Sequence, residues 1–260
     1  MKVVILCGGK GMRLREETEY KPKALVTIGD MPIIWHIMKT YAHHGYKDFI
    51  LCLGYKGEMI KDYFLKFDES TNDLTLKLGA GPKEIIYHDK KKLIDGWNIT
   101  FAETGLHANT GARIARIKEY IGNDENFFVT YGDAVADLNI KASLAFHKEK
   151  GKIATLSGVN YINPFGIIEP ENGLVKRFKE KPQSRAFING GFFVFNRKVF
   201  NYLSDADDCI LEKTPLETLS AKGELAIYKH HNFWYCVDTM KHLEDLNEMY
   251  REGKKPWVVW

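Results

Sequence analysis

Met1 to Leu25 reads MKVVILCGGKGMRLREETEYKPKAL, and this stretch decides the fold. Residues 3–6 are apolar and largely β-branched, which predicts a buried strand. The strand stops at the Gly-Gly-Lys-Gly turn of residues 8–11, where the glycines leave backbone N–H groups uncovered and let the chain close on an anion. Arg13 and Lys23 add two cations beside this turn. Together these features predict a phosphate-binding loop.

Two nucleotide-binding loops of other classes fit this turn poorly. A dinucleotide fingerprint needs a third small residue where Leu14 stands. An ATP-binding P-loop needs a Gly-Lys-Ser/Thr ending, which the turn does not contain. The alternative is a strand-to-helix turn that needs glycine only for steric reasons, and this interpretation stays open. The adjacent Arg13 and Lys23 favour a bound anion instead.

The composition is that of an ordinary globular protein, with 45% apolar and 27% charged residues in a chain of 260. A net charge of +3, from 37 basic and 34 acidic residues, is too balanced to favour nucleic acid as the main partner. No apolar run approaches the roughly 20 residues of a membrane span, and only five apolar residues follow Met1-Lys2 before the glycines. We therefore expect a cytoplasmic protein that binds neither nucleic acid nor membrane.

The cysteines and histidines suggest no catalytic role of their own. The four cysteines form no Cys-x-x-Cys pair, so the sequence contains no zinc or redox motif, and Cys7 and Cys52 are predicted to be core residues at the ends of apolar runs. His36 lies in an apolar helical pattern and is also expected in the core. The pairs His43-His44 and His230-His231 are expected on the surface.

Strand and helix patterns alternate through the first part of the chain, which is typical of a parallel sheet flanked by helices. Strands are predicted at residues 3–6, 49–53, 98–102, 127–131 and 153–157, and helices at about 32–44, 56–67, 110–121 and 139–150, the first of them capped by Asp30. From Tyr161 the pattern becomes short and β-like, at 167–168, 174–178 and 188–195, which predicts a small antiparallel addition. Helices at about 197–204, 215–222 and 239–252 and a strand at 225–229 complete the chain. We expect one Rossmann-like α/β domain over residues 1–260, with a mostly parallel central sheet.

Acidic residues follow two apolar runs, at Asp133 after residues 127–131 and at Asp238 after residues 233–237. In open α/β sheets, ligands lie at the carboxyl ends of strands, so the two carboxylates could converge on one cation. A hard cation with oxygen ligands and phosphates is typically Mg²⁺. For Asp238, capping of the last helix stays open as an alternative. Thr104 with Arg113 forms a third polar cluster near a strand end.

Read as GGxGxRL followed by KPKxL, the opening stretch resembles the sugar-nucleotide pyrophosphorylases, which are nucleoside triphosphate:sugar-1-phosphate nucleotidyltransferases. Residues 16–41, EETEYKPKALVTIGDMPIIWHIMKTY, resemble their glucose-1-phosphate cytidylyltransferase branch. TYGDAVAD at 130–137 is similar to the family's TYGDGVAD, and VDT at 237–239 to its MDT, whose aspartates hold the catalytic Mg²⁺. The resemblance covers essentially the whole chain.

The resemblance implies four sets of functional residues. Catalytic roles fall to Arg13, Lys23 and Asp133, and metal binding to Asp133 and Asp238. Nucleotide binding falls to Leu6, Gly8, Gly9, Lys10, Gly11, Met12, Arg13, Thr104, Gly111, Arg113 and Gly132. The segments EKP at 180–182 and INGG at 188–191 resemble sugar-contacting segments, so sugar-phosphate binding falls to Lys23, Glu180, Lys181, Asn189 and Gly190. Residues 1–157 would then be a nucleotide-binding part, and 158–260 a sugar-binding and C-terminal part.

The activity implied is condensation of CTP with a sugar 1-phosphate, α-D-glucose 1-phosphate above all, to a CDP-sugar and pyrophosphate, with Mg²⁺ as cofactor. Family members assemble as trimers or hexamers, so the resemblance also implies a homo-oligomer. Alternatives are a related transferase with another base, such as UTP or dTTP, or another acceptor, and a non-catalytic protein that binds nucleotide sugars. An NAD-dependent oxidoreductase is disfavoured by Leu14 and by Leu53-Gly54, where an acidic ribose contact would be needed.

The sequence departs from the family's pattern at five places that flank the expected substrate sites. They are Met12 in place of Thr, Ala112 and Ala134 in place of Gly, Pro164 in a segment that lacks the usual Arg, and Lys241 in place of Arg. Lysine lacks the planar fork of arginine, so Lys241 is not expected to make a bidentate contact. Because Arg13, Lys23, Asp133 and Asp238 stay in place, we expect the chemistry to be retained and leave the acceptor sugar open.

Overall fold

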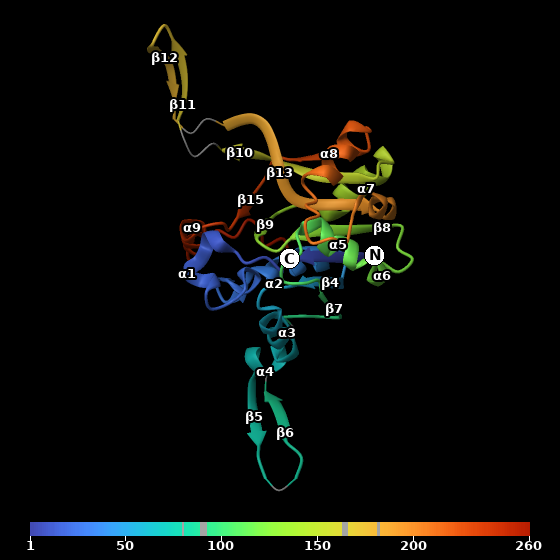
Figure 1. Ribbon diagram of the computed structural model, residues 1–260. Coiled ribbons are helices and arrows are strands. Elements are labelled where there is room, and N and C mark those ends of the chain that lie inside the picture. Colours follow the sequence, from blue (N-terminus) through green and yellow to red (C-terminus); the bar gives the residue numbers. More distant parts are fainter. Residues whose placement is uncertain (80, 89–92, 163–165, 181–182) are drawn as a thin grey trace.

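The computed structural model describes residues 1–79, 81–88, 93–162, 166–180 and 183–260. Within these residues, seven strands form one central sheet (Figure 1). Their order across the sheet is β14 (Leu225–His230), β10 (Ala154–Ile162), β13 (Gln183–Asn196), β8 (Asn126–Tyr131), β1 (Lys2–Leu6), β4 (Asp48–Leu53) and β7 (Asn98–Glu103). The strand that precedes the glycine loop therefore lies inside the sheet.

The sheet is mostly parallel, which confirms the predicted fold class. β1 pairs in parallel with β4 and β8, β4 with β7, and β10 with β14. Only β13, among the described strands of this sheet, runs antiparallel to both of its neighbours, β8 and β10.

The prediction for residues 188–195 was wrong in one respect, because they belong to β13 in the middle of the main sheet and not to a flanking addition. The reason is visible in the burial of this strand. Phe192, Phe193, Val194 and Phe195 are all at most 4% exposed, so side chains on both faces of the strand are covered. β13 is also paired along both of its edges, with β8 and with β10, so it is an interior strand of the sheet.

Helices cover both faces of the sheet. The longer ones are α2 (Ile33–His43), α3 (Gly57–Leu65), α5 (Thr110–Arg116), α7 (Ile140–Lys150), α8 (Thr214–Ala221) and α9 (Met240–Arg251). The shorter ones are α1 (Arg15–Thr18), α4 (Phe67–Thr71), α6 (Lys118–Ile121) and the 3₁₀ helices η1 (Met12–Leu14), η2 (Lys23–Leu25) and η3 (Arg197–Tyr202). Successive residues of β1 alternate between two cores: Val3 and Ile5 pack with α2 and α9, and Val4 packs with α5, α6 and α8.

Two details of the helices differ from prediction. Pro32 is the N-cap of α2, and its extended backbone leads into the helix without a side-chain cap from Asp30. The helix expected over 110–121 is divided into α5 and α6 at Ile117, whose ψ of 9° departs from helical geometry.

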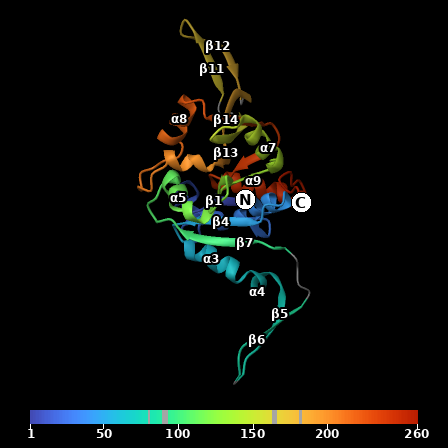
Figure 2. The same ribbon diagram turned by 90° about the vertical axis from the view of Figure 1, so that its right-hand side faces the viewer.

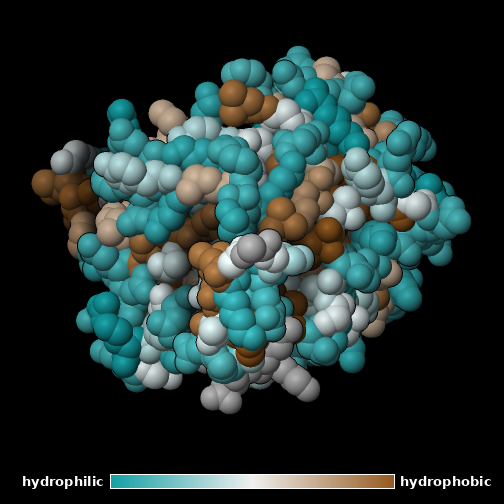
Figure 3. Space-filling view, turned by 90° about the horizontal axis from the view of Figure 1, so that it is seen from below, coloured by the Kyte–Doolittle hydropathy of each residue, from teal (hydrophilic) through white to brown (hydrophobic). Residues whose placement is uncertain are grey.

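Two hairpins project from opposite ends of the molecule (Figures 1 and 2). One is β5 (Asp73–Lys77) with β6 (Glu84–His88), and the other is β11 (Ile167–Glu171) with β12 (Leu174–Lys179). The second is the predicted antiparallel addition. Seen along the first hairpin, the surface is mainly hydrophilic, with apolar residues in small groups (Figure 3). None of the helices in the described ranges is long and apolar enough to cross a membrane.

The position of β13 leads to a stability prediction. Phe193→Ala removes a ring that is 2% exposed in the middle of the sheet, so we expect the free energy of unfolding to fall by about 3 to 5 kcal/mol. Urea unfolding followed by circular dichroism measures this change. The matched control is Phe178→Ala in the β12 hairpin, where the ring is 60% exposed and little burial is lost. Equal losses in the two variants would contradict the interior position of β13.

Candidate active site

A cleft of about 360 Å³ opens at the carboxyl ends of β1 and β8. This is the edge at which ligands lie in open α/β sheets. Ten residues predicted from the sequence line it: Leu6, Gly8, Gly9, Gly11, Met12, Arg13, Lys23, Arg113, Gly132 and Asp133. The glycine loop and the end of β8 thus face one cavity.

The glycine loop adopts a conformation that side chains would prevent. Gly11 has a φ of +62°, in the left-handed region that favours glycine. A Cβ on Gly8 would lie 2.1 Å from Nη1 of Arg113, because the loop passes directly over that guanidinium. The carbonyl of Gly8 accepts hydrogen bonds from Nη2 of Arg113 and from the backbone N–H of Tyr55, both at 3.0 Å. The close approach requires glycine at position 8.

A short two-stranded ladder brings the two distant aspartates together. β9 (Ala134–Ala136) begins directly after Asp133, and β15 (Trp234–Cys236) ends two residues before Asp238. The two strands pair antiparallel with Cys236 opposite Ala134, and the N–H of Val237 donates to the carbonyl of Asp133 at 2.9 Å. Adjacent ends of paired strands place both carboxylates at the mouth of the cleft.

Asp238 does not cap the last helix. The N-cap of α9 is Thr239, whose Oγ1 accepts from the N–H of His242 at 3.3 Å. The alternative that the sequence left open for Asp238 is therefore wrong, and its carboxylate is directed to the cations of the cleft.

Four charged side chains form one cluster at the cleft. Nζ of Lys23 lies 2.6 Å from Oδ2 of Asp133 and 2.9 Å from Oδ1 of Asp238, and Nη1 of Arg13 lies 2.9 Å from Oδ2 of Asp238. The Lys23 side chain is only 14% exposed, whereas that of Arg13 is 74% exposed. Lys23 is therefore held in place, and Arg13 is a solvent-facing arm at the rim.

The electrostatics of the cluster favour the charged forms. Burial lowers the pKa of Lys23, but the carboxylates of Asp133 and Asp238 raise it, so that the net pKa lies above the ordinary value of lysine. Burial raises the pKa of Asp238, but Lys23 and Arg13 lower it, and its net pKa lies below the ordinary value. Two carboxylates and two cations thus balance each other in charge.

The same carboxylates could hold a metal ion. Asp133, Cys236 and Asp238 each offer a ligand atom, and these three atoms lie within 4.8 Å of one another. Burial, with the two carboxylates, raises the pKa of the Cys236 thiol, so its protonated form is a poor ligand and the useful donors are carboxylate oxygens. Oxygen donors suit a hard cation. The Lys23 ammonium already lies between the two carboxylates, which shows that a positive charge fits there.

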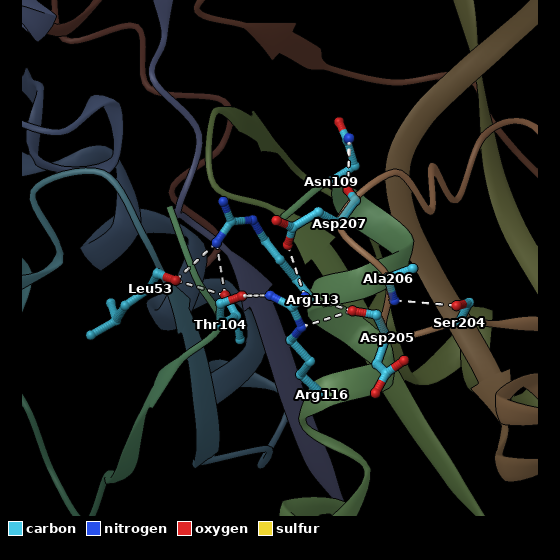
Figure 4. A network of polar contacts seen from close by, with 9 residues as sticks. All are labelled: Leu53, Thr104, Asn109, Arg113, Arg116, Ser204, Asp205, Ala206 and Asp207. Atoms are coloured by element: carbon cyan, nitrogen blue, oxygen red, sulfur yellow. Dashed lines mark hydrogen bonds and ion pairs between the residues drawn. The ribbon is translucent and has the colours of Figure 1, made fainter. Parts of the chain in front are cut away.

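Arg113 contacts Gly8 of the glycine loop, and Figure 4 shows it beside Thr104 and Leu53. Arg113 is 4% exposed and donates to the carbonyl of Leu53 at 2.8 Å and to Oγ1 of Thr104 at 2.7 Å, in addition to Gly8. Thr104 is 1% exposed and is not among the residues that line the cleft. Arg113 therefore joins the ends of β1, β4 and β7, and its guanidinium supports the loop from below.

Two other predicted nucleotide-binding residues also lie away from the lining of the cleft. Lys10 is exposed on the outer side of the glycine loop. Gly111 lies against the segment that follows η3, where a Cβ would be 2.6 Å from Sγ of Cys209. Glycine is needed at position 111 because two segments of backbone pass close together.

The predicted sugar-binding residues are placed unevenly. Asn189 and Gly190 lie in β13 beside the cleft: Nδ2 of Asn189 donates to the Tyr131 hydroxyl at 3.2 Å, and the carbonyl of Gly190 accepts from Nε1 of Trp234 at 2.8 Å. Glu180 is exposed at the end of β12 and is not among the lining residues. Lys181 and Pro164 lie outside the residues that the structure describes.

Sequence reasoning missed several residues of the cleft. Lining positions that it did not assign to the site are Cys7, Ala24, Ala108, Asn109, Thr110 and Tyr131. Tyr131 directly precedes Gly132-Asp133, so the strand end that revealed Asp133 could also have revealed it. Glu212, which accepts a hydrogen bond from the Tyr131 hydroxyl, lies 81 residues further along and had no local signal.

The histidine predictions were confirmed for His36 and wrong for His230. His36 is 3% exposed, lies 3.0 Å from the carbonyl of Ile28, and has a pKa that burial lowers to about 4. His230 was expected on the surface but is 6% exposed, because it lies 3.1 Å from Asp137 and 3.0 Å from the carbonyl of Phe233. Cys7 and Cys52 are buried, as predicted.

Comparison with known proteins agrees with this geometry. Residues 2–253 match the family model described as nucleotidyl transferase. The chain is 45% identical over 260 residues to a "Probable glucose-1-phosphate cytidylyltransferase" of Bacillus subtilis (strain 168) and 46% identical over 261 residues to a "Glucose-1-phosphate cytidylyltransferase" of Salmonella typhi, with 100% of both chains covered in each case.

Solved structures share the fold at low sequence identity. The crystal structure of HddC from Yersinia pseudotuberculosis is 21% identical with a TM-score of 0.70, covering 96% of this chain and 99% of that one. A UDP-glucose pyrophosphorylase from acinetobacter baumanii is 16% identical with a TM-score of 0.72, covering 98% and 95%. At these identities the likeness concerns the fold alone.

The depressed pKa of Asp238 leads to a pH prediction. A carboxylate whose folded pKa lies below its unfolded pKa contributes stability above the unfolded value and loses it as the pH falls through the folded value. We expect the difference in free energy of unfolding between the parent chain and Asp238→Asn to be largest near neutral pH. It should shrink as the pH falls from about 5 to about 2.

Urea unfolding at each pH measures this difference. The control is Asp62→Asn, which removes an exposed pair with Lys66 and should change stability by less than about 1 kcal/mol throughout. A difference for Asp238→Asn that stays constant down to pH 2 would contradict the assigned role of the two cations.

Proposed function

The chain belongs to the nucleotidyl transferase family, and we propose that it condenses CTP with α-D-glucose 1-phosphate to CDP-glucose and pyrophosphate. The observation that carries the proposal is the convergence of Arg13, Lys23, Asp133 and Asp238 on the cleft beside the glycine loop. The full-length similarity to two proteins named as glucose-1-phosphate cytidylyltransferases supports the choice of base and sugar.

The reaction needs no general base, because the attacking group is already anionic. An oxygen of the sugar 1-phosphate forms a bond to the α-phosphorus of CTP, and the bond from that phosphorus to the oxygen bridging to the β-phosphate breaks. Pyrophosphate leaves with the electron pair of the broken bond. Catalysis then depends on aligning two anions and stabilising charge at phosphorus.

The residues of the cluster suit these two tasks. Arg13, exposed at the rim, can turn from Asp238 to the departing β- and γ-phosphates. Lys23, buried between the carboxylates, is placed to exchange them for oxygens of the α-phosphate and of the incoming sugar phosphate. The backbone N–H groups of the glycine loop are uncharged hydrogen-bond donors for the triphosphate.

Asp133 and Asp238 would hold Mg²⁺, which neutralises charge on phosphate oxygens when it is bound. Their role is to fix the cation at the edge of the cleft that faces the triphosphate. Lys23 pairs with the same two carboxylates that would bind the cation. Binding of the cation would therefore release Lys23, and the ammonium could then pair with phosphate.

The assay for the proposed function is release of pyrophosphate from CTP and α-D-glucose 1-phosphate in the presence of Mg²⁺. UTP and dTTP replace CTP in parallel reactions, and other sugar 1-phosphates replace the glucose compound. Turnover with another pair of substrates, and none with CTP and glucose 1-phosphate, would change the substrates that we assign to the enzyme. No turnover with any pair would favour a non-catalytic protein that binds nucleotide sugars. We keep the expectation of a cytoplasmic homo-oligomer, a trimer or hexamer, as part of the proposal, and light scattering tests the assembly.

Lys23→Ala should lower kcat/KM by about 10²- to 10³-fold, because it removes a cation from the charge that develops at phosphorus. The matched control is Lys21→Ala in the same Lys-Pro-Lys motif, where the ammonium pairs with Glu17 at 2.9 Å on helix α1 and away from the cleft. Initial rates of pyrophosphate release measure both variants. Similar losses in Lys21→Ala and Lys23→Ala would argue against a specific role for Lys23.

Removal of divalent ions should abolish turnover, since the anions would then meet without the cation that the two carboxylates hold. We expect pyrophosphate release to fall at least about 10²-fold in EDTA and to return on addition of Mg²⁺. The urea unfolding midpoint, measured in EDTA, checks that the fold survives the treatment. Full activity in EDTA would exclude the assigned role of Asp133 and Asp238.

A further inference from the structure

The segment of residues 203–213, between η3 and α8, is held firmly against the start of α5. The N–H of Asn109 donates to the carbonyl of Asp207 at 2.9 Å, and the N–H of Ala112 donates to that of Cys209 at 3.1 Å. Arg116 donates to the backbone carbonyl of Asp205 at 3.0 Å and to Oδ1 of Asp207 at 2.8 Å (Figure 4). The segment therefore has a fixed position beside the cleft, and Glu212 lies at the end of it.

Glu212 connects the two sides of the cleft through hydrogen bonds. Its Oε2 accepts from Oγ1 of Thr110 at 2.7 Å, and its Oε1 accepts from the hydroxyl of Tyr131. That hydroxyl accepts from Nδ2 of Asn189 at 3.2 Å, and Oδ1 of Asn189 accepts from the N–H of Gly191 at 2.9 Å. Thr110 and Tyr131 line the cleft, and Asn189 lies next to it on β13.

We propose that Glu212 is a positioning residue that orients the Asn189 amide through the Tyr131 hydroxyl, so that Asn189 presents an N–H donor to the bound sugar phosphate. The proposal rests on the proposed function and on the sugar-phosphate role that the sequence resemblance implies for Asn189. It concerns a residue from a segment far along the chain, which the sequence did not single out.

The direction of each hydrogen bond follows from the chemistry of the groups. An ionised carboxylate only accepts, so Glu212 takes the single hydrogen of the Tyr131 hydroxyl. A tyrosine hydroxyl ordinarily carries its hydrogen at neutral pH, so that hydrogen is available to Glu212. Its lone pairs then face Nδ2 of Asn189. A primary amide nitrogen carries two hydrogens, and the second is left to donate to a ligand.

Packing fixes the Tyr131 ring independently of Glu212. A Cβ on Gly191, whose φ is +78°, would lie 2.5 Å from Cδ2 of Tyr131, so the ring rests directly on this stretch of backbone. The ring also makes an edge contact with Phe193, with centroids 5.7 Å apart. Loss of the Glu212 carboxylate should therefore change the direction in which the Tyr131 O–H bond points more than it changes the position of the Tyr131 ring.

Glu212→Gln tests this division of roles. Glutamine retains the shape of the side chain but replaces one carboxylate oxygen with an N–H₂ group. Where that group faces Tyr131, the hydroxyl oxygen must accept a hydrogen bond from it. The hydroxyl hydrogen then points toward Asn189. The Asn189 amide then loses its acceptor. We expect KM for α-D-glucose 1-phosphate to rise about tenfold, the effect of one hydrogen bond, while kcat and KM for CTP stay within about twofold of the parent.

Tyr131→Phe and the double variant complete the experiment. Because both single changes remove the same link, the double variant should show about the same rise in KM as either single variant. Glu217→Gln, on the exposed first turn of α8, is the matched control and should leave both KM values unchanged. Equal effects on kcat and on both substrates, or additive effects in the double variant, would overturn the positioning role.

A second readout separates this proposal from the proposed function. The free energy of unfolding of the parent, the two single variants and the double variant, measured in urea without substrate, should show coupling between Tyr131 and Glu212. Absence of coupling refutes the hydrogen-bond chain itself, whatever the substrate. Coupling without turnover of any substrate pair by the parent chain overturns the proposed function, and with it the assignment of a sugar phosphate to Asn189.

Discussion

The pairing of β9 with β15 is the constraint on which the cleft depends. Asp133 and Asp238 are separated by most of the C-terminal half of the chain, and neither position alone forms a site. The ladder joins the end of one segment to the start of the other and closes with the hydrogen bond from Val237 to Asp133. Without it, two carboxylates would not be held close enough to share one cation.

Holding two carboxylates together costs free energy through repulsion, and the structure offsets this cost with Lys23 and Arg13. The four charges of the cluster thus balance one another before any substrate binds. The same two cations are those that the triphosphate would need, so the resting arrangement prepares the site instead of blocking it. The two cations differ in exposure, because the largely covered Lys23 is held between the carboxylates while Arg13 extends into solvent.

Behind this charged layer lies a second layer of polar contacts, which is buried at Arg113 and reaches the surface at Arg116 and Glu212. Arg113 joins the ends of three strands under the glycine loop, and Arg116 ties α5 to the segment of residues 203–213 (Figure 4). Glu212 extends the same support to Tyr131 and Asn189. The two faces of the cleft are therefore not independent loops but parts of one hydrogen-bonded frame. Precise placement of reacting groups depends on such support.

The α/β class, the glycine loop and the four charged residues of the cluster could be predicted from the sequence, because each has a local signal. An apolar run that ends in glycine, or in glycine and aspartate, marks a strand end whatever surrounds it. The resemblance to a known family then supplied the expected reaction. The mostly parallel sheet and the buried state of Cys7, Cys52 and His36 followed from the same patterns.

Only the tertiary structure decided which of these signals meet. The position of β13 inside the sheet, the burial of His230 against Asp137, and the support of the loop by Arg113 depend on partners distant in sequence. Glu212 has no local pattern at all, and its role exists only because residues 203–213 pack against α5. Local residue patterns report backbone geometry and burial within one segment, whereas a site is made by contacts between segments, which no single segment encodes.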